Sequence, residues 1–256
     1  MKEIATFNDL KNTSVFITGG GSGIGAALTE GFLQQGARVA FVQRSDAIIF
    51  CDEMEAKHDN RPLFMQCDIT DIDALKACID HSATVHGSIS TLINNAANDE
   101  RHTTAEVDSE YWDRMIAINF KSYFFACQAV IPGMQTNGGG SIINFSSISY
   151  MMGNSGFPVY TGSNSGINGM TRSLAREFGP SKIRVNVIAP GWVLTEKQLD
   201  KWATPDGLAA HMDRQSLKEH LKPSDIVGAA LFLASGASRM MTGQSMVVDG
   251  GVVVTG

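Results

Sequence analysis

The 256-residue sequence is poor in proline and cysteine, and both shortages exclude whole classes of protein. It holds 7 prolines and 4 cysteines beside 26 glycines and 43% hydrophobic residues, a composition that rules out collagen-like, disordered and disulfide-stapled chains. No C-x-x-C pair and no histidine at metal-ligand spacing accompanies the cysteines, so we expect no metal site. We expect reduced, mostly buried thiols at Cys51, Cys67, Cys78 and Cys127.

Positive charge and long apolar runs are also scarce. The 20 Lys and Arg residues are outnumbered by 26 Asp and Glu, so the formal net charge is −6 and no broad basic surface can bind phosphate backbones. No stretch reaches the roughly 20 apolar residues that span a bilayer, and the N-terminal stretch MKEIATFNDLKNTSVFITGG lacks the apolar centre of a signal peptide. We therefore expect a cytoplasmic protein without nucleic-acid or membrane partners.

Short apolar runs rich in β-branched residues alternate with longer stretches of helical periodicity. Runs such as VFIT, VAFV and SIINF are apolar on both faces, which is typical of parallel strands covered by helices on both sides. The pattern predicts an α/β fold with a doubly wound parallel sheet. The expected strands are Ser14–Thr18, Arg38–Val42, Pro62–Cys67, Thr91–Asn94, Ser141–Phe145, Arg184–Ile188 and Ser245–Val248.

No repeat, charge block or linker divides the chain, so we expect residues 1–256 to form a single domain. Thr70 and Asp73 resemble a capping box at a helix start, and Gly36 and Gly179 mark helix ends. The long polar segment at about 190–223 is predicted to be a substrate lid, because loops of that length usually have a function.

A glycine-rich turn, TGGGSGIG, joins the first expected strand to an amphipathic helix. Gly19 and Gly23 permit a tight turn and close backbone approach, Gly25 lets the helix pack on the strand, and the helix N-terminus then faces a pyrophosphate. Such a run can also serve only to turn the chain, but the strand–turn–helix context favours a dinucleotide site. The predicted contacts in this turn are Gly19, Gly21, Ser22, Gly23, Ile24 and Gly25.

The second expected strand is followed by Gln43 and Arg44, about 20 residues after the glycine turn, where a protein that prefers NAD places a carboxylate. Arg44 suits a 2′-phosphate, so we expect NADP in preference to NAD, the alternative being a solvated arginine at a strand end. Asp68 closes the third expected strand, where it fits either the adenine edge or an ordinary turn.

Together these motifs resemble the short-chain dehydrogenase/reductase family over essentially the whole chain. TGGGSGIG, Asp68, NNAA, Asn119, Ser147, Tyr160, PG and VDGG follow the order and spacing of the family. The resemblance implies a Rossmann-like fold with seven parallel strands, a nicotinamide cofactor and a homo-oligomer, either tetramer or dimer. It also implies cofactor contacts at Ile69, Asn95, Ala96, Ala97, Tyr160, Asn164, Pro190, Gly191, Val193 and Thr195.

The family's catalytic roles can be carried over to three of these positions. Tyr160 would exchange the proton of the reacting hydroxyl or carbonyl, and Ser147 would hydrogen-bond its oxygen. Asn119 would hold a proton-relay water, the alternative being an amide satisfied within its own helix. A phenol with a pKa of about 10 serves as a base near neutral pH only if a nearby cation lowers that pKa.

The sequence departs from the family at the position of that cation. The family pattern Tyr-x-x-x-Lys reads Tyr160-Thr-Gly-Ser-Asn164 here, so an uncharged amide stands one helical turn from the tyrosine. Asn164 could hydrogen-bond the nicotinamide ribose, but it cannot lower the tyrosine pKa by its charge. Three interpretations follow: a weakened or pH-shifted enzyme, an engineered or naturally silenced variant, or a site where another cation substitutes. Gly162 within this helix costs about 1 kcal/mol relative to Ala.

Within the family, the stretches around 98–102, 144–149 and 190–198 resemble the sugar-oxidising members, such as xylose and related aldose dehydrogenases. The implied reaction oxidises the anomeric carbon of an aldose to a lactone with NAD(P). The alternatives are a carbonyl or ketoacyl-type reductase and, in another class, a catalytically impaired NADP-binding protein. The predicted substrate contacts, each of which could equally be part of a polar rim, are Asn98, His102, Ser147, Asn154, Trp192 and Gln198.

Oligomerisation is implied only by the family resemblance. Helices around Tyr111–Pro132 and Tyr160–Phe178 carry the apolar faces through which relatives usually pair. The same apolar stripes would equally pack on the sheet.

Overall fold

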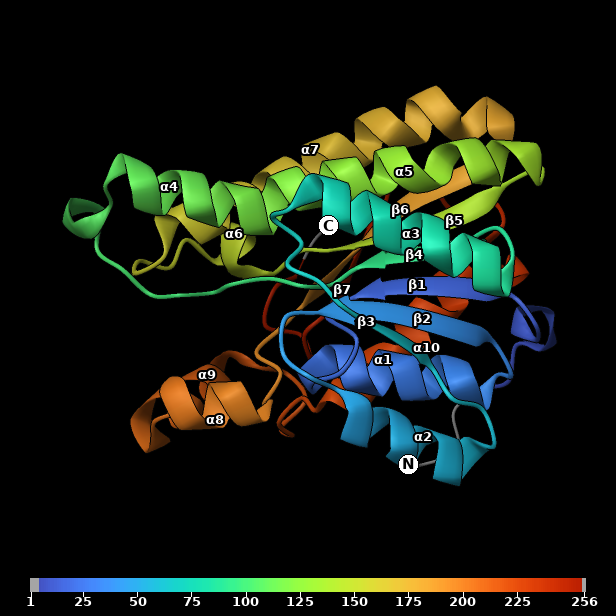
Figure 1. Ribbon diagram of the computed structural model, residues 1–256. Helices are drawn as coiled ribbons and strands as arrows, with labels where there is room; N and C mark the ends of the chain where they lie inside the picture. The colour runs from blue at the N-terminus through green and yellow to red at the C-terminus, as the bar shows by residue number, and fades with distance from the viewer. Residues whose placement is uncertain (1–4, 255–256) are drawn as a thin grey trace.

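The computed structural model describes residues 5–254. The short apolar runs within them form a seven-stranded parallel sheet in the order β3-β2-β1-β4-β5-β6-β7 (Figure 1). The order reverses beside β1, which is the doubly wound Rossmann-like arrangement that the sequence predicts. Part of the N-terminal stretch considered above, residues 1–4, lies outside the described residues. The strands are β1 (Ser14–Thr18), β2 (Arg38–Gln43), β3 (Leu63–Gln66), β4 (Thr91–Asn94), β5 (Gly140–Phe145), β6 (Ile183–Pro190) and β7 (Ser245–Val248).

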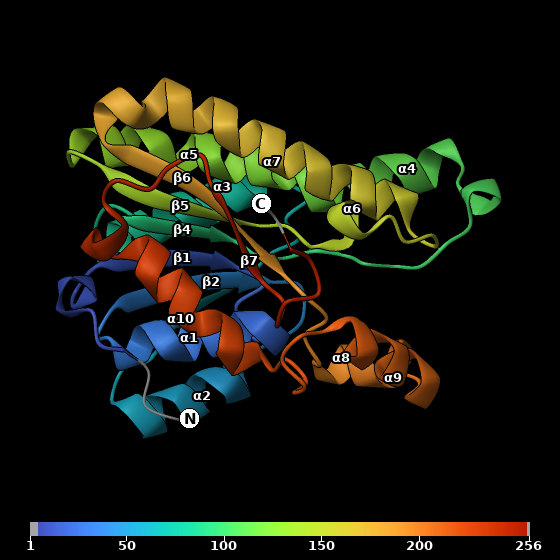
Figure 2. The same cartoon turned by 180° about the vertical axis from the view of Figure 1, so that it is seen from behind.

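Helices cover both faces of the sheet, as Figures 1 and 2 show from opposite sides. Side chains of β1 alternate between the layers: Val15 and Ile17 share a buried cluster with Leu28 of α1, and Phe16 shares another with Leu75 of α3. α1 (Gly23–Gln34), α2 (Ile48–His58) and α10 (Pro223–Ala234) lie on the first face. The second face carries α3 (Ile72–His86), α5 (Ser122–Thr136) and α7 (Pro158–Phe178).

The carboxyl ends of all the strands lie at one edge of the sheet, because the strands are parallel. Here α4 (Ser109–Ile116) and α6 (Ser149–Met152) lie at the same end of the molecule as α8 (Glu196–Lys201) and α9 (Pro205–Arg214) (Figure 2). The segment predicted as a lid therefore contains two short helices. Within residues 5–254 no helix is both long and apolar enough to cross a membrane.

Two local expectations differ from the structure. The predicted capping box is wrong: Asp71 caps α3 by accepting from Ala74 N at 3.0 Å, because Thr70 bonds to the Asp68 carboxylate instead. The helix expected around 111–132 is interrupted by a π-helical turn, η3 (Ala117–Lys121). Gly36, with φ +75°, follows α1, and Gly179 follows α7, as expected.

Candidate active site

The glycine-rich turn after β1 has the backbone geometry that only glycine adopts easily. Gly19 and Gly23 have φ values of +71° and +53°. A Cβ atom on Gly25 would lie 1.8 Å from the carbonyl oxygen of Gly19, so any side chain there would push α1 away from the turn. Asn95 donates from Nδ2 to the carbonyl oxygens of Thr18 and Gly19, both at 3.1 Å, which joins the ends of β1 and β4. Ser22 is the N-cap of α1 and does not use its side chain as a cap.

The end of β2 carries a neutral amide and an unpaired cation. Gln43 accepts from the backbone N–H of Gly21 at 3.0 Å and donates to the carbonyl oxygen of Ser45 at 3.1 Å. The side chain therefore occupies the space over Gly21, where a Cβ would lie 2.6 Å from Gln43 Oε1. Arg44 is exposed, and among residues 5–254 its guanidinium has neither a hydrogen bond nor an ion pair. This edge can thus receive an anionic group on the adenosine side.

The remaining predicted cofactor residues lie at the same edge of the sheet. Asp68 is exposed after β3 and accepts from Thr70 through one oxygen, and Ile69 beside it is buried. Gly191 donates to the carbonyl oxygen of Val248 at 2.9 Å, just beyond the end of β6. Thr195 caps α8, and its methyl group would lie 3.1 Å from a Cβ on Gly23, so the start of the lid segment contacts the glycine turn. Pro190 and Val193 are buried, whereas Ala96 is partly buried and Ala97 exposed.

A buried amide network holds β4, β5 and α7, the elements that carry the predicted catalytic residues, in register. Asn94 donates to Asn144 Oδ1 at 2.9 Å, and Asn144 donates to Thr171 Oγ1 at 3.0 Å. Asn168 of α7 donates to Ser146 Oγ at 3.1 Å, next to Ser147. Because unsatisfied polar groups are costly when buried, these bonds specify how α7 packs on the sheet.

Asn119 lies in the π-helical turn η3 and is 2% exposed. Its side chain accepts from the backbone N–H of Asn98 at 2.8 Å and donates to the carbonyl oxygen of Asn98 at 3.0 Å. The amide is therefore satisfied across a loop rather than within its own helix. This pair of bonds fixes the backbone at Asn98, in the loop that leaves β4.

Tyr160 and Asn164 lie one turn apart on α7, which begins at Pro158, a residue suited to the first helical position. Burial is the main cause that raises the pKa of Tyr160 to about 12, and the negative charge of Asp99 acts in the same direction. Hydrogen bonding by Asn164 and Ser147 and the charge of Arg101 lower it by less. A phenol in this state remains protonated at neutral pH, as expected where the usual cation is missing.

The predicted substrate residues fall into two groups. Trp192 donates from Nε1 to Gln198 Oε1 at 2.9 Å, and Gln198 donates to the Asp99 carboxylate, so these two residues lie together on the lid side. His102 is 8% exposed, with its ring edge-on to Tyr111. Asn98 bonds to Glu100 at 3.4 Å, and Asn154 is exposed beside Met152. Of these predicted residues, only the first group links the segment predicted as a lid to the loop after β4.

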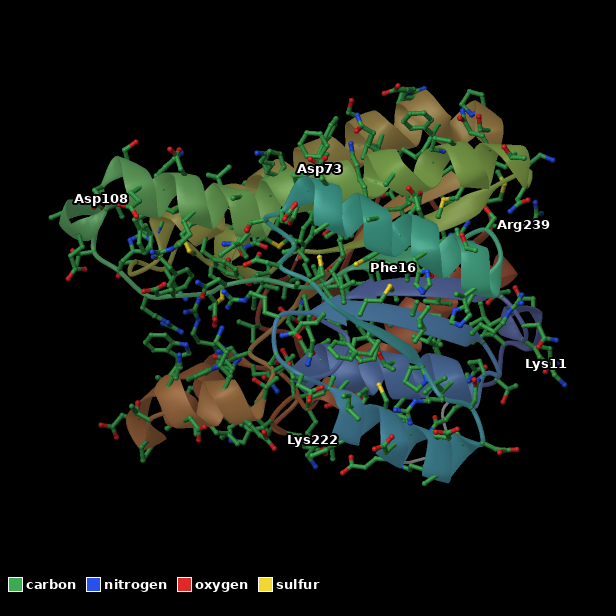
Figure 3. The ribbon with its side chains drawn as sticks, in the orientation of Figure 1. Lys11, Phe16, Asp73, Asp108, Lys222 and Arg239 are labelled. Carbon is green, nitrogen blue, oxygen red and sulfur yellow. The ribbon has the colours of Figure 1, made fainter. Side chains whose placement is uncertain are left out.

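Two contacts across the mouth of the site were not predicted from the sequence. Lys197 of α8 forms an ion pair with Asp99 at 2.6 Å. The Arg101 guanidinium lies over the rings of Phe157 and Trp202, with its Cζ 4.8 and 5.3 Å from their centres. Side chains fill the space between α8 and the loop ahead of Asp108 in Figure 3. The partners come from three separate segments, so no local motif signals them.

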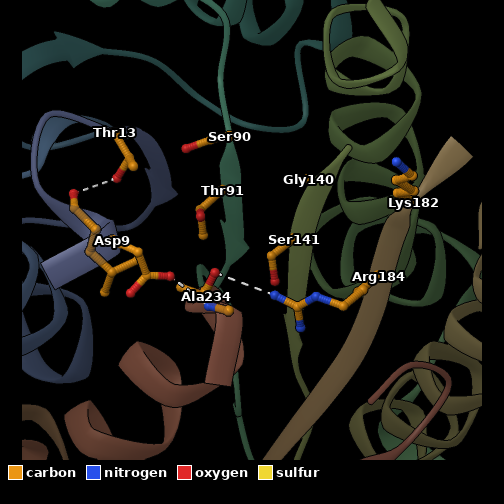
Figure 4. Close-up of a pocket in the computed structure, with 11 residues that line it drawn as sticks. Asp9, Thr13, Ser90, Thr91, Gly140, Ser141, Lys182, Arg184 and Ala234 are labelled. Carbon is orange, nitrogen blue, oxygen red and sulfur yellow. Dashed lines mark hydrogen bonds between the residues drawn. The ribbon is translucent and has the colours of Figure 1, made fainter. Parts of the chain in front are cut away.

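A cavity of about 240 Å³ lies at the opposite edge of the sheet, against the first residues of β4, β5 and β6 (Figure 4). Arg184 donates to Ser238 Oγ at 2.8 Å and to the carbonyl oxygen of Ala234 at 3.3 Å. Ser141 donates to the carbonyl oxygen of Leu233 at 2.8 Å. These bonds hold the end of α10 on the sheet, so we attribute the polar lining to packing of α10.

A family model described as enoyl-(acyl carrier protein) reductase matches residues 19–253, from the glycine turn to the C-terminal segment. The chain belongs to the short-chain dehydrogenase/reductase family. It is an NAD(P)-dependent oxidoreductase of that family. The family, the Rossmann-like sheet and the enzyme class that the motifs predict are thus confirmed.

Several short-chain dehydrogenases/reductases match nearly the whole chain. A probable galactose dehydrogenase, GalD, from Rhizobium meliloti (strain 1021) is 46% identical over 248 residues, which cover 96% of this chain and 97% of the relative. D-xylose 1-dehydrogenase from Caulobacter vibrioides (strain NA1000 / CB15N) is 43% identical over 248 residues, which cover 96% of this chain and 98% of the relative.

Two solved structures have the same fold. A 3-oxoacyl-[acyl-carrier protein] reductase from Brucella melitensis ATCC 23457 is 29% identical with a TM-score of 0.91, and the match covers 100% of this chain and 98% of that one. A blue fluorescent protein from a metagenomic library, solved in complex with NADPH, is 32% identical with a TM-score of 0.88. The match covers 96% of this chain and 100% of that one. Both likenesses extend over the candidate site as well as the sheet.

Proposed function

We propose that this enzyme oxidises a cyclic aldose at the anomeric carbon to a lactone, with NADP as the preferred acceptor. The observation that carries the proposal is the set of polar groups around Tyr160: Ser147 and Asp99 both act on the phenol, and Asp99 accepts from Gln198, which also accepts from Trp192. Sugar hydroxyls need such hydrogen-bonding groups, and an aromatic face suits a pyranose ring. The similarity to galactose and D-xylose 1-dehydrogenases supports the same substrate class.

In this reaction Ser147 binds the anomeric hydroxyl and Tyr160 accepts its proton. A nicotinamide cofactor, when bound, would supply the acceptor for the hydride of the anomeric carbon. Asn119 holds the backbone at Asn98, so the loop after β4 stays in place beside the reacting groups. The proton on Tyr160 then leaves to solvent, and the sugar leaves as the lactone.

The preference for NADP rests on the end of β2. Gln43 provides no carboxylate for the ribose hydroxyls, and the unpaired guanidinium of Arg44 matches a 2′-phosphate. Gly19, Gly23 and Gly25 leave the backbone of the turn open to a pyrophosphate.

We further propose a cytoplasmic homo-oligomer, either tetramer or dimer. Exposed Trp112 and Phe124, on α4 and α5, leave apolar surface outside the sheet packing, and the wider helix faces around them support pairing. Size-exclusion chromatography with light scattering tests this proposal.

The proposed function is tested by NADP and NAD reduction rates over a panel of aldoses, with aliphatic alcohols as competitors. We expect turnover of at least one pentose or hexose, and a faster rate with NADP than with NAD. This turnover should be lost in Tyr160→Phe and strongly reduced in Ser147→Ala. Tyr150→Phe, which removes a phenol outside the reacting pair, is the matched control. Oxidation of alcohols but no aldose would contradict the substrate class.

A further inference from the structure

Arg101 is held at the mouth of the site by two aromatic rings. Its Cζ lies 4.8 Å from the ring centre of Phe157 and 5.3 Å from that of Trp202. Phe157 precedes α7 and is 8% exposed, and Trp202 follows α8 of the lid segment. A planar guanidinium is attracted to both ring faces, so the charge is fixed although the side chain is exposed.

The same phenylalanine connects this cation to the catalytic tyrosine. The rings of Phe157 and Tyr160 meet edge to face with centres 6.0 Å apart and an interplanar angle of 66°. Phe157 therefore packs against both Arg101 and Tyr160, and an apolar ring beside the two groups screens their charges less than water would.

The charges around Tyr160 leave Arg101 as the uncompensated one. The charged and titratable groups that bear on Tyr160 are Asp99 and Arg101 on the loop after β4 and Tyr123 on α5. Asp99 is paired with Lys197 at 2.6 Å, which offsets part of its charge, and Tyr123 is buried with its pKa raised, so Tyr123 stays neutral. Arg101 pairs with no carboxylate among residues 5–254.

We propose that Arg101 is a positioning residue for the aldose oxidation proposed above, because it supplies Tyr160 with part of the positive charge that Asn164 lacks. The ionised phenolate is stabilised by the guanidinium across Phe157, and Trp202 keeps the guanidinium in place. The lid thus contributes to activation of the tyrosine as well as to enclosure of the substrate. The kinetic test rests on the proposed function, whereas the spectroscopic one does not.

The first test follows the ionisation of Tyr160 by NMR of protein labelled at tyrosine Cζ. The chain has 4 tyrosines, and the Tyr160→Phe variant assigns the signal. An Asn164→Lys background brings the ionisation into an accessible pH range. There Arg101→Gln is expected to move the midpoint to higher pH, and Arg101→Lys to move it less. Arg239→Gln, at the opposite end of the molecule from Asp108 in Figure 3, is the matched charge control and leaves it unchanged.

The second test is the pH dependence of kcat/KM for the aldose. Arg101→Gln is expected to lower the rate about three- to ten-fold at pH 8, because a loss of about half to one pKa unit of stabilisation of the phenolate lowers its ionised fraction by that factor. The KM for the aldose stays within about two-fold. Trp202→Ala, which frees the guanidinium, shifts the profile in the same direction.

An unchanged Tyr160 midpoint in Arg101→Gln would overturn the inference. A raised KM with an unaltered pH profile would also overturn it, because Arg101 would then act on the substrate. If no aldose is oxidised by the wild-type enzyme, the proposed function fails, but the NMR comparison still decides the role of Arg101.

Discussion

Asn164 donates from Nδ2 to the backbone carbonyl oxygen of Tyr160 at 2.9 Å, one turn back along α7. One N–H of this amide, on a side chain that is 3% exposed, is thereby bonded within its own helix, at the position where the family pattern expects a lysine. The amide satisfies a polar group without bringing charge to the phenol. Burial raises the pKa of Tyr160 to about 12, and no positive charge at position 164 opposes this shift.

Asn164→Lys is expected to raise the rate of aldose oxidation at neutral pH at least about ten-fold, because one pKa unit corresponds to a ten-fold change in the ionised fraction. In the wild type, kcat/KM should rise about ten-fold for each pH unit between 7 and 10, since Tyr160 is mostly protonated over that range. Steady-state pH profiles of both proteins test this.

Asn164→Gln is the matched control, since it keeps an amide and adds no charge. A wild-type profile that is flat between pH 7 and 10 would contradict the assignment of Tyr160 as the ionising group.

The ion pair between Asp99 and Lys197 links the lid to the loop after β4, and two variants separate its two effects. Burial raises the pKa of Asp99, but Lys197 and Gln198 lower it by more, so the pKa lies below that of an ordinary aspartate. The ion pair should therefore persist until the pH falls below the usual pKa of an aspartate. Asp99→Asn and Lys197→Met should both raise the KM for the aldose about two- to five-fold by loosening the lid.

Their pH profiles should move in opposite directions. Asp99→Asn removes an anion and lowers the pKa of Tyr160, whereas Lys197→Met leaves that anion unpaired and raises it further. The two kcat/KM profiles, compared with the wild type, check this sign. Shifts in the same direction would mean that Asp99 acts on the lid alone.

Arg44→Ala tests the cofactor preference. Loss of a charge-assisted bond to a 2′-phosphate should lower kcat/KM for NADP about ten- to hundred-fold and leave NAD within about two-fold. Arg239→Ala controls for the change in net charge. Equal losses with both cofactors would place Arg44 outside the phosphate site.

Gly162→Ala tests the stability of α7. Nothing lies within 4 Å of a Cβ at this exposed position, so alanine should raise the free energy of unfolding by up to about 1 kcal/mol. Thermal unfolding measures the gain. Gly25→Ala is the contrasting variant, because its Cβ would lie 1.8 Å from the Gly19 carbonyl oxygen. The displaced glycine turn should weaken cofactor binding.

The seven strands could be predicted from the sequence because each is a short run apolar on both faces, as a sheet covered by helices requires. The predicted bounds of β1, β4 and β7 match the observed ones, and the other predicted strands differ at their ends by one or two residues: β6 continues to Pro190, and β3 is limited to Leu63–Gln66. The N-cap of α3 could not be predicted, because two neighbouring side chains compete for the same groups. The Thr70 hydroxyl donates to the Asp68 carboxylate, and Asp71 accepts from the backbone N–H of Ala74 instead.

The sequence by itself determined the strands and helices, the glycine turn and the one-turn spacing of Tyr160 and Asn164, because each depends on a local pattern along the chain. Only the tertiary structure decided what surrounds the tyrosine. Arg101, Phe157 and Trp202 come from three segments, and their contact exists only after the sheet and the lid have packed. The field at a buried phenol depends on distances between such segments, which no pattern along the chain contains.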